Sequence, residues 1–515
     1  MYNAIPCAPT GGERADITQG VLVTKEVVGG GAVDGSVTDE VARRPRHRLQ
    51  GNMGLPHLMF TVVAYNAPLG QSAAILPLAI ALGAGLGSPL LFLALGVVFA
   101  IFAVGYTAMA NILPRAGAFY AFVAAGLGRP LGVAASFVAV LTYVMGVGFI
   151  LPFSSLSTQT LVTGFGGPDI DWWVWALIFA AGMGVLGFVK IDFSARVLGV
   201  LVACEVLLVV VYDVVVAAKG GATGHLGVNP FDPSALTTSG AAIAIVFAIA
   251  CFGGFESTAI YRDEVRSPRR TIPRATFLAV LVITLFYTVG SWLLIEAYGE
   301  ENAVSVIGAD PVSALLNSMG QYLGGTMQDI ASVLLITSLF ASLVALHNVI
   351  VRYIFNLGAD GVLPNALGQS HLRLGSPHRA SLTLSALTVA YLVIAAVVAG
   401  DPQSIFTVLA GVQGYGFVVL LFMAAVGIAA YLIRNRGTST VGVWTWGIAP
   451  SASVVITGAI LVLVTVNLDL LTGGSAMVEI VTIALLASAL VLGVAVALVF
   501  RSRRPDTYQR IGRQD

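Results

Sequence analysis

Long, unbroken apolar runs are the feature of this sequence that most restricts its fold. A helix that crosses the roughly 30 Å hydrocarbon core of a bilayer needs about 20 apolar residues, and such runs recur between residues 58 and 500. Charged residues make up only 10% of the chain, whereas a soluble domain carries about 25%. The runs are continuous and do not alternate with polar residues, which predicts helices rather than strands. We therefore expect an all-α polytopic membrane protein, which excludes a soluble enzyme and a nucleic-acid-binding protein.

Twelve windows are long and apolar enough to predict transmembrane helices. They cover about residues 58–83, 89–113, 132–163, 172–189, 195–218, 238–261, 275–298, 329–357, 381–399, 404–432, 445–467 and 477–500. Residues 1–50 are polar and lack apolar periodicity, so we expect a disordered tail. Residues 501–515 form a second tail.

The positions of Lys and Arg predict how the chain is oriented. Basic residues cluster at 43–48, in alternate loops and at 501–513, whereas acidic residues dominate the other loops, in which only Lys219 is basic. Cytoplasmic loops carry the excess of Lys and Arg, so we expect both termini to be cytoplasmic, in the plasma membrane. The basic segment at 43–48 is better explained by anionic lipid than by nucleic acid.

The cysteine and histidine residues show no spacing typical of a metal site. The three cysteines are Cys7 in the polar tail and Cys204 and Cys251 in apolar runs, an arrangement that argues against a disulfide framework. We expect no cofactor and no metal.

Two of the predicted helices contain residues that interrupt helical structure near the middle of the membrane. The first contains Tyr65-Asn66-Ala67-Pro68-Leu69-Gly70-Gln71-Ser72, and the sixth contains Cys251-Phe252-Gly253-Gly254-Phe255-Glu256-Ser257. Proline removes a backbone donor and clashes with the preceding turn. Interruptions in helices 1 and 6 predict two five-helix repeats of opposite topology, and paired interruptions are the best sequence indication of a transporter's binding site.

The interrupted segments are also the candidate substrate site. Freed N–H groups favour a carboxylate and freed carbonyls favour an ammonium group or a cation, so a zwitterionic amino acid fits both. The alternative is that Pro68 only kinks its helix and that Gly253 and Gly254 only permit close packing. The candidate residues are Tyr65, Asn66, Pro68, Leu69, Gly70, Gln71, Ser72, Phe252, Gly253, Gly254 and Phe255. The aromatic members are as well suited to core packing, and Gln413 and Tyr415 are further candidates.

Three stretches of the sequence resemble the amino acid–polyamine–organocation family of permeases. They are Gly254-Phe255-Glu256 with Asp263-Glu264, Pro268 and Ile272-Pro273-Arg274-Ala275; Pro114-Arg115-Ala116-Gly117-Ala118-Phe119-Tyr120; and Arg352 with Asp360-Gly361 and Leu363-Pro364. The family's usual Gly-Ser-Gly-x-Phe in helix 1 is replaced here by Gly70-Gln71-Ser72-Ala73-Ala74. The resemblance implies a leucine-transporter-like fold, with a transporter core of ten helices over 51–435, two further helices in 436–500, and substrate between helices 1, 3, 6, 8 and 10.

Polar side chains inside the predicted spans are candidates for ion coupling. A charge at the centre of a span costs about 2.5–3.5 kcal/mol, so Glu205 and Glu256 should be protonated, paired or next to water. For Glu205 we consider proton coupling, a structural hydrogen bond or contact with a substrate amine. The resemblance places Glu256 between the site and the cytoplasm, in gating, coupling or stabilising the interrupted helix. Asp213 lies nearer a span end and should be solvated, while Ser338 and Ser342 either help form a sodium site or pack helices.

The sequence thus predicts a secondary transporter of amino acids or related amines that works by alternating access. Protons are the expected coupling ion and sodium is the competitor. The alternatives are an exchanger of amino acids or polyamines with the same fold, and a sensor that binds substrate without moving it. An enzyme is not expected, because no convergent nucleophile and base are found. The expected partners are the substrate, the ion and the bilayer, and the protein is expected to be a monomer or homodimer.

Overall fold

The computed structural model describes residues 53–510, apart from eight short gaps. The gaps are 114–118, 190–194, 237, 261–264, 372–375, 399–400, 437–441 and 472–474. The predicted tail at residues 1–50 lies outside the described residues. Those that are described form helices and turns, with one isolated β-bridge between Met53 and Val265 and no β-strand.

Nine helical segments within the described ranges are long and apolar enough to cross a membrane. They are Pro68–Ile112, Arg129–Gly164, Gly199–Lys219, Pro268–Tyr298, Gly325–Ala359, His378–Val397, Pro402–Arg434, Trp444–Val466 and Ala476–Arg503. The first contains a kink at Gly83, after which Gly85 has a φ of 56°. Two shorter apolar helices, Trp172–Phe188 and Gly240–Ala250, fall in the predicted fourth and sixth windows. The protein is a multi-pass membrane protein whose described part is all-helical.

The helices follow one another along the chain with short connections. They are α1 Leu55–Asn66, α2 Pro68–Leu78, α3 Ser88–Ile112, α4 Phe119–Leu127, α5 Arg129–Gly164, α6 Trp172–Val189, α7 Ala195–Lys219, α8 Thr238–Ala250, α9 Ser257–Ile260, α10 Pro268–Tyr298, α11 Ala303–Ala309, α12 Ala314–Leu323, α13 Gly325–Ala359, α14 His378–Val398, α15 Pro402–Arg434, α16 Ala449–Val466, α17 Leu468–Leu471, α18 Ala476–Arg503 and α19 Pro505–Arg510.

Local sequence signals explain where several of these helices begin. Helices α2, α3, α5, α10 and α15 each carry proline in the first turn, where its missing N–H is not needed. The Asp401 carboxylate caps α15 by accepting hydrogen bonds from the N–H groups of Gln403 and Ser404. The Ser404 hydroxyl also donates to it, and together these donors lower the pKa of Asp401. The cap is therefore charged at neutral pH, as the positive N-terminal end of a helix favours.

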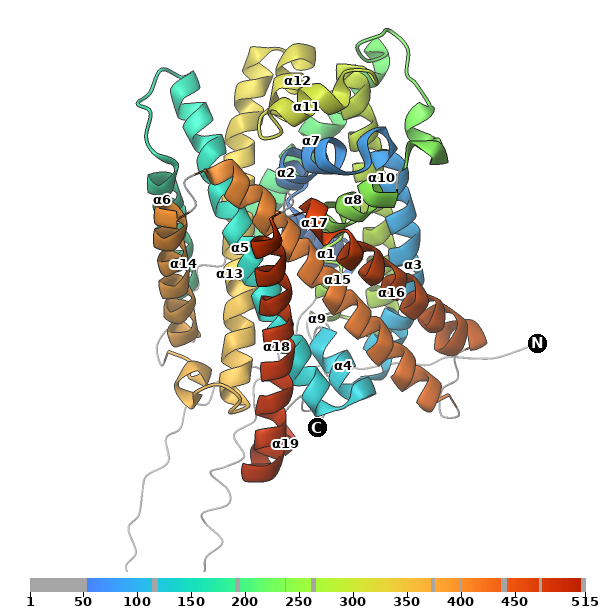
Figure 1. Ribbon diagram of the computed structural model, residues 1–515, viewed down its shortest axis with the longest axis vertical. Helices are drawn as coiled ribbons and strands as arrows, with labels where there is room; N and C mark the ends of the chain where they lie inside the picture. Colours follow the sequence, from blue (N-terminus) through green and yellow to red (C-terminus); the bar gives the residue numbers. More distant parts are fainter. Residues whose placement is uncertain are drawn as a thin grey trace, which may run out of the picture. The chain divides into compact units, whose positions relative to one another are not determined.

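Helix α15 packs closely along several neighbours because glycines bring the backbones together. A Cβ at Gly126 on α4 would lie 1.9 Å from the Gly427 carbonyl oxygen, and one at Gly414 on α15 would lie 1.9 Å from the Val246 carbonyl oxygen on α8. Small residues permit such contact between membrane helices. Figure 1 shows α15 running obliquely past α5, and α6 beside α14.

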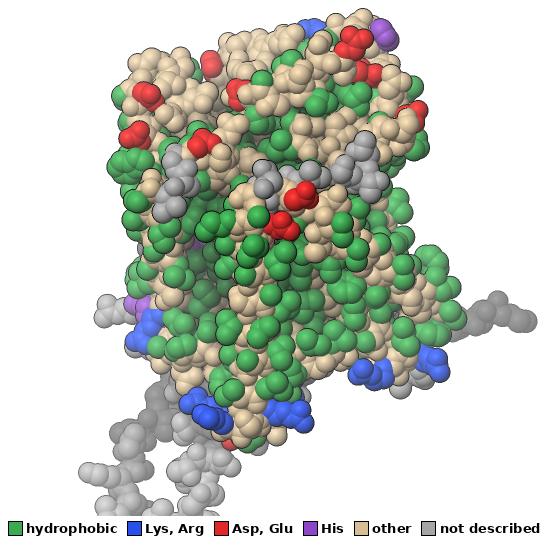
Figure 2. Space-filling view, viewed as in Figure 1, with side chains coloured by type: hydrophobic (Ala, Val, Ile, Leu, Met, Phe, Trp, Pro, Cys, Tyr) green, Lys and Arg blue, Asp and Glu red, His purple; other side chains and the backbone are tan. Residues whose placement is uncertain are grey.

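The surface has the polarity of a membrane protein. Figure 2 shows apolar side chains over the middle of the visible face, Asp and Glu mostly towards one end and Lys and Arg mostly towards the other. The end with acidic side chains is the one where α12 lies (Figure 1). Large apolar side chains such as Val397 and Met477 are exposed by 80% and 76%, as expected of residues that face lipid.

Candidate functional site

The first predicted helix is interrupted at a single residue. Helix α1 ends at Asn66, and α2 begins at Pro68. Between them Ala67 has φ 46° and ψ 73°, the only positive φ of a non-glycine residue in the described part of the chain. The residue before a proline is disfavoured in the right-handed helical region, so Pro68 explains the position of the interruption. The interruption predicted within 65–72 is confirmed.

The second interruption is a run of turns at 251–256, between α8 and α9. The N–H groups of Cys251, Phe252 and Gly253 each donate to the carbonyl three residues earlier, at 3.0–3.1 Å. Gly254 then takes a φ of 94°, which a residue with a Cβ adopts only with strain. The interruption predicted within 251–257 is also confirmed.

Asn66 joins the two interruptions. Its Nδ2 donates to the carbonyl oxygens of Cys251 and Gly253, the latter at 3.2 Å. The Tyr287 hydroxyl on α10 donates to Asn66 Oδ1. Because Asn66 is only 3% exposed, these bonds form away from water. The carbonyls freed by the second interruption are therefore satisfied by a side chain from the first.

Glu256 is held inside the turn that precedes it. Its Oε2 accepts a hydrogen bond from the Gly254 N–H at 2.9 Å, and its Oε1 accepts one from the Tyr143 hydroxyl on α5 at 3.1 Å. The Tyr106 hydroxyl on α3 donates to the Glu256 backbone carbonyl at 2.6 Å. The carboxyl group thus ties the interrupted segment to α5, and it is only 2% exposed.

Glu205 lies on α7, and its carboxyl group approaches the N-terminal end of α2. It is 2% exposed, and its Oε2 accepts a hydrogen bond from the Ser338 hydroxyl on α13 at 2.8 Å. The backbone of Leu69 lies within hydrogen-bonding reach of the same carboxyl group. The N-terminus of a half-helix favours a negative charge, so Glu205 lies where a substrate carboxylate was expected to bind.

The expectation that Asp213 is solvated is wrong. Its side chain is only 7% exposed, and its Oδ1 has no hydrogen-bond partner among the described residues. Helix α7 packs against α2, α10, α12 and α13, and this packing is not visible from the position of Asp213 along its span. A second acid is therefore buried on α7.

A small central cavity lies where α5, α13 and α15 meet the two interruptions. Its volume is about 30 Å³, room for about two water molecules. Its polar lining residues are Asn66, Gln71, Tyr143, Ser342 and Gln413. The rest of its wall is mainly apolar, with Phe149, Ile150, Leu346 and Phe417. None of the described residues that line it is charged.

Three polar atoms of this central cavity have no hydrogen-bond partner in the part of the chain that the structure describes. They are Gln71 Oε1, Ser342 Oγ and Gln413 Oε1, all buried. An unsatisfied buried polar group costs about 1–3 kcal/mol, and such groups in a native structure call for an explanation, such as water or an ion that binds there. The cavity therefore offers hydrogen bonds to a small polar solute beside an apolar wall.

Other candidate residues contribute backbone or packing instead of lining this cavity. Phe252 and Phe255 are fully buried, and both rings pack on Phe99 of α3, at centroid distances of 4.5 and 5.3 Å. Pro68, Leu69, Gly70, Ser72 and Gly254 are not among the lining residues. The side chain of Tyr65 lies outside the described residues.

The two serines of the possible sodium site have different neighbours. Ser338 donates to Glu205, whereas Ser342 faces the central cavity. Of the additional candidates, Gln413 lines the cavity, but the Tyr415 hydroxyl pairs with Thr465 at 3.0 Å.

Two further residues, Tyr143 and Tyr287, hold Glu256 and Asn66 and were not predicted from the sequence. A tyrosine hydroxyl within an apolar span needs a partner when buried, and this signal could have identified both.

Comparison with known proteins decides the family. The family model described as amino acid permease matches residues 73–509. The chain belongs to the amino acid permease family. The match agrees with the resemblance seen in the sequence motifs, and the relatives are transporters. This permease is accordingly a transport protein and not an enzyme.

Three relatives indicate the range of substrates within the family. Branched-chain amino acid permease BcaP of Bacillus subtilis (strain 168) is 26% identical over 60% of this chain and 68% of its own length. The protein of the same name from Lactococcus lactis subsp. cremoris (strain MG1363) is 22% identical over 68% and 76%. Cationic amino acid transporter 2, vacuolar, of Arabidopsis thaliana is 24% identical over 74% and 63%.

Proposed function

We propose that this permease moves amino acids or related amines across the plasma membrane by alternating access, with the central cavity as its substrate site. The observation that carries this proposal is that Gln71, Ser342 and Gln413 present unpartnered buried polar atoms to a cavity that both helix interruptions border. Interrupted helices at the level of the bilayer are tolerated where protein or water meets the freed backbone. The named substrates of the three relatives are amino acids, which supports this class.

The side chains at the interruptions resemble the two charged ends of an amino acid. The Asn66 amide donates to the carbonyls of Cys251 and Gly253, as an ammonium group would. The Glu205 carboxyl group lies at the N-terminus of α2, as a substrate carboxylate would. Substrate binding therefore replaces Asn66 at these carbonyls, and the central cavity enlarges as the two interrupted segments move apart.

An aliphatic, uncharged side chain suits the central cavity better than a cationic one. The described lining contains no carboxylate, because Glu256 is bonded to Tyr143 and to the Gly254 N–H and Glu205 to Ser338. A buried cationic group without a counter-charge is strongly disfavoured. Phe149, Ile150, Leu346 and Phe417 offer apolar contact in its place.

Glu205 is our candidate for proton coupling, and Glu256 for gating. Glu205 contacts both α13 and the start of α2, so a change in its protonation alters a bond between segments that must move. Moving one charge through 100 mV is worth about 2.3 kcal/mol, enough to sustain roughly a fifty-fold gradient. Sodium bound by Ser338 and Ser342 is the alternative, and it would have to compete with Glu205 for Ser338.

The proposed layout has twelve spans, with helices 1–5 and 6–10 as two inverted repeats. It comprises a cytoplasmic tail at 1–50, a transporter core at 51–435, two further helices in 436–500 and a cytoplasmic tail at 501–515. The interruptions fall at corresponding places in the two repeats, which supports the arrangement. The separation of acidic and basic side chains supports cytoplasmic termini.

Uptake into proteoliposomes tests the proposed function. A panel of labelled amino acids and polyamines is offered with a proton gradient, a sodium gradient or neither. We expect uptake of aliphatic amino acids driven by the proton gradient. Uptake that requires amino acid inside the vesicles would indicate an exchanger, and binding without uptake would indicate a sensor. If no amino acid or amine is bound or transported, the proposal is wrong.

Glu256→Gln tests the role of the acid in the second interruption. The amide keeps the shape of the side chain but removes the charge, so we expect gradient-driven uptake to fall more than substrate binding. Glu301→Gln removes a charge from an exposed residue between α10 and α11 and serves as the control. Uptake at the wild-type rate in Glu256→Gln would rule out the assigned role.

A further inference from the structure

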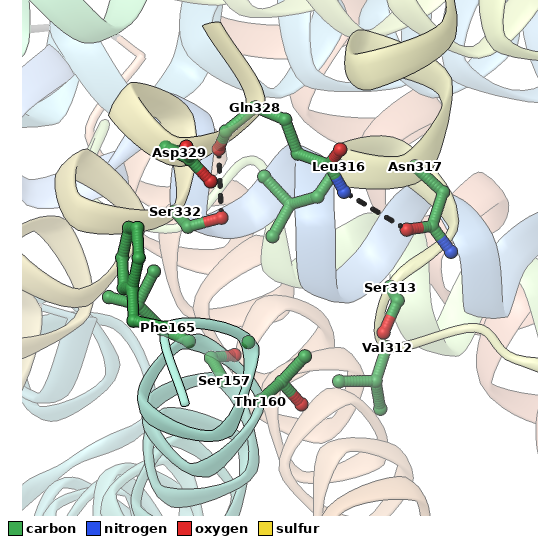
Figure 3. Close-up of a pocket in the computed structure, with 12 residues that line it drawn as sticks. Ser157, Thr160, Phe165, Val312, Ser313, Leu316, Asn317, Gln328, Asp329 and Ser332 are labelled. Carbon is green, nitrogen blue, oxygen red and sulfur yellow. Dashed lines mark hydrogen bonds between the residues drawn. The ribbon is translucent and has the colours of Figure 1, made fainter. Parts of the chain in front are cut away.

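A second cavity lies away from the central one, at the end of the molecule where acidic side chains gather. Its volume is about 210 Å³, and it lies between the end of α5, the beginning of α12 and the beginning of α13 (Figure 3). We call it the end cavity. It shares no lining residue with the central cavity. Along α5 its lining begins at Ser157, seven residues after Ile150 of the central cavity, a rise of about 10 Å.

Two hydroxyls that line the end cavity are available to a ligand as hydrogen-bond acceptors. The hydroxyls of Ser157 and Ser332 donate their hydrogens to the carbonyls of Phe153 and Gln328, each at 2.8 Å. A hydroxyl that has donated its hydrogen retains only acceptor capacity. Figure 3 shows Asp329 and Ser332 on one side of the cavity and Asn317 and Ser313 on the other.

Among the described residues that line the end cavity, Asp329 is the only charged one. Its carboxylate accepts hydrogen bonds and donates none, and it is exposed. Leu161, Phe165, Val312 and Leu316 add apolar surface next to these acceptors. The lining therefore matches a ligand with several N–H donors, a positive charge and a short aliphatic part.

We propose that the end cavity is a second binding site, which takes the ammonium group of a small primary amine, amino acids included, with Asp329 as its counter-charge. An ammonium group carries three donors and no acceptor, which complements the acceptors of Asp329, Ser157 and Ser332. The acidic end of the molecule raises the local concentration of such cations. This site goes beyond the proposed function, and it stands whether or not the central cavity binds substrate.

Protection of an engineered cysteine tests this proposal at the site itself. Thr160→Cys is introduced on the exposed rim of the end cavity in a full-length chain in which Cys7 and Cys204 are replaced by serine. The purified protein in lipid nanodiscs is treated with a maleimide in the presence of L-leucine, butylamine or 4-methylpentanoate. We expect the two amines to slow labelling at least five-fold, whereas 4-methylpentanoate, which has no amino group, leaves the rate unchanged.

Asp329→Asn decides whether the carboxylate is the counter-charge. An ion pair with an exposed carboxylate is weakened by solvent screening, so the amine concentration that gives half-protection should rise about two- to five-fold. Glu301→Gln, which removes a charge outside the cavity, should leave that concentration unchanged. Asn317→Cys provides a second reporter on the opposite wall, where the same pattern is expected.

Two outcomes would overturn the proposal. One is equal protection in the wild-type and Asp329→Asn backgrounds, and the other is equal protection by 4-methylpentanoate and the amines. Uptake into proteoliposomes distinguishes a failure of this proposed second site from a failure of the proposed transport function. Normal uptake without protection of the cysteine would contradict only the proposed amine site in the end cavity. Protection without uptake would contradict only the proposed transport function.

Discussion

Asn66 concentrates several of the contacts that hold the two interruptions together. Its amide satisfies the carbonyls of Cys251 and Gly253, and its carbonyl oxygen accepts the Tyr287 hydroxyl. The end of α1, the turns between α8 and α9, and α10 thus meet through one side chain. In the proposed cycle the substrate takes over these carbonyls, so Asn66 is both a structural link and a competitor of the substrate.

Removing the Asn66 amide should destabilise the protein. Asn66→Ala leaves the Cys251 and Gly253 carbonyls and the Tyr287 hydroxyl buried and unpaired, at a cost of about 1–3 kcal/mol for each group that stays unsatisfied. We expect a lower unfolding temperature in detergent. Asn467→Ala is the control, because within the described part of the chain Asn467 donates only to the nearby Leu463 carbonyl. Equal unfolding temperatures for Asn66→Ala and this control would contradict the assigned role.

The left-handed conformation of Ala67 predicts an unusual response to glycine. This conformation destabilises a residue with a Cβ by about 1–2 kcal/mol, whereas glycine adopts it without that cost. Ala73→Gly, in the regular part of α2 and equally buried, loses a methyl group and gains flexibility without relieving strain. We expect Ala67→Gly to be about 1 kcal/mol more stable than Ala73→Gly in denaturant unfolding. A less stable Ala67→Gly would show that the interruption is not strained.

Part of the central cavity could be predicted from the sequence. Asn66, Gln71 and Gly253 were predicted from the interruption motifs and do line the cavity. They could be predicted because proline, glycine and amide side chains stand out in an apolar run. Phe252 and Phe255 could not be placed, since the direction of a side chain in an irregular turn does not follow helical periodicity. Their rings pack on α3 instead.

At the scale of elements, α15 connects the central cavity to α8, the helix that precedes the second interruption. Gln413 lines the cavity, and the next residue, Gly414, lies against the Val246 carbonyl of α8. The position of Gln413 therefore depends on how closely these two helices approach.

Gly414→Ala should separate α15 from α8. The new Cβ would meet the Val246 carbonyl oxygen at 1.9 Å, and overpacking of this kind costs about 1–3 kcal/mol. We expect a lower unfolding temperature and weaker substrate binding. Gly325→Ala, where a Cβ meets nothing within 4 Å, should change neither. Unchanged binding in Gly414→Ala would mean that this contact does not position the cavity.

Most elements were predictable from the sequence because a bilayer requires long apolar helices. The windows at 132–163 and 404–432 match α5 and α15 to within three residues at each end. The sixth window was harder to delimit, because α8 and α9 are separated by turns and are individually short. The burial of Asp213 could not be predicted, since it depends on how α7 packs against helices from elsewhere in the chain.

For the whole molecule, the separation of acidic and basic side chains sets the expected orientation. The end with α12 and the end cavity would face the outside, and the end of α18 would face the cytoplasm. An ammonium-binding cavity at the outer end would be the first site that a substrate meets.

Labelling of single cysteines in intact cells tests this orientation. Both reporters are exposed, Glu301→Cys in the acidic turn after α10 and Ser502→Cys near the end of α18. A membrane-impermeant maleimide should label the first in intact cells and the second only after permeabilisation. The reverse pattern would place the termini outside and overturn the proposed layout.

The central claim is that substrate binds where the two interrupted helices meet. The most direct measurement is an experimental structure with a bound amino acid that the proteoliposome panel identifies as transported. We predict ligand density in contact with Gln71 and Gln413, with the Asn66 amide displaced from the Cys251 carbonyl. A ligand found only elsewhere, with Asn66 still bonded to that carbonyl, would contradict the claim.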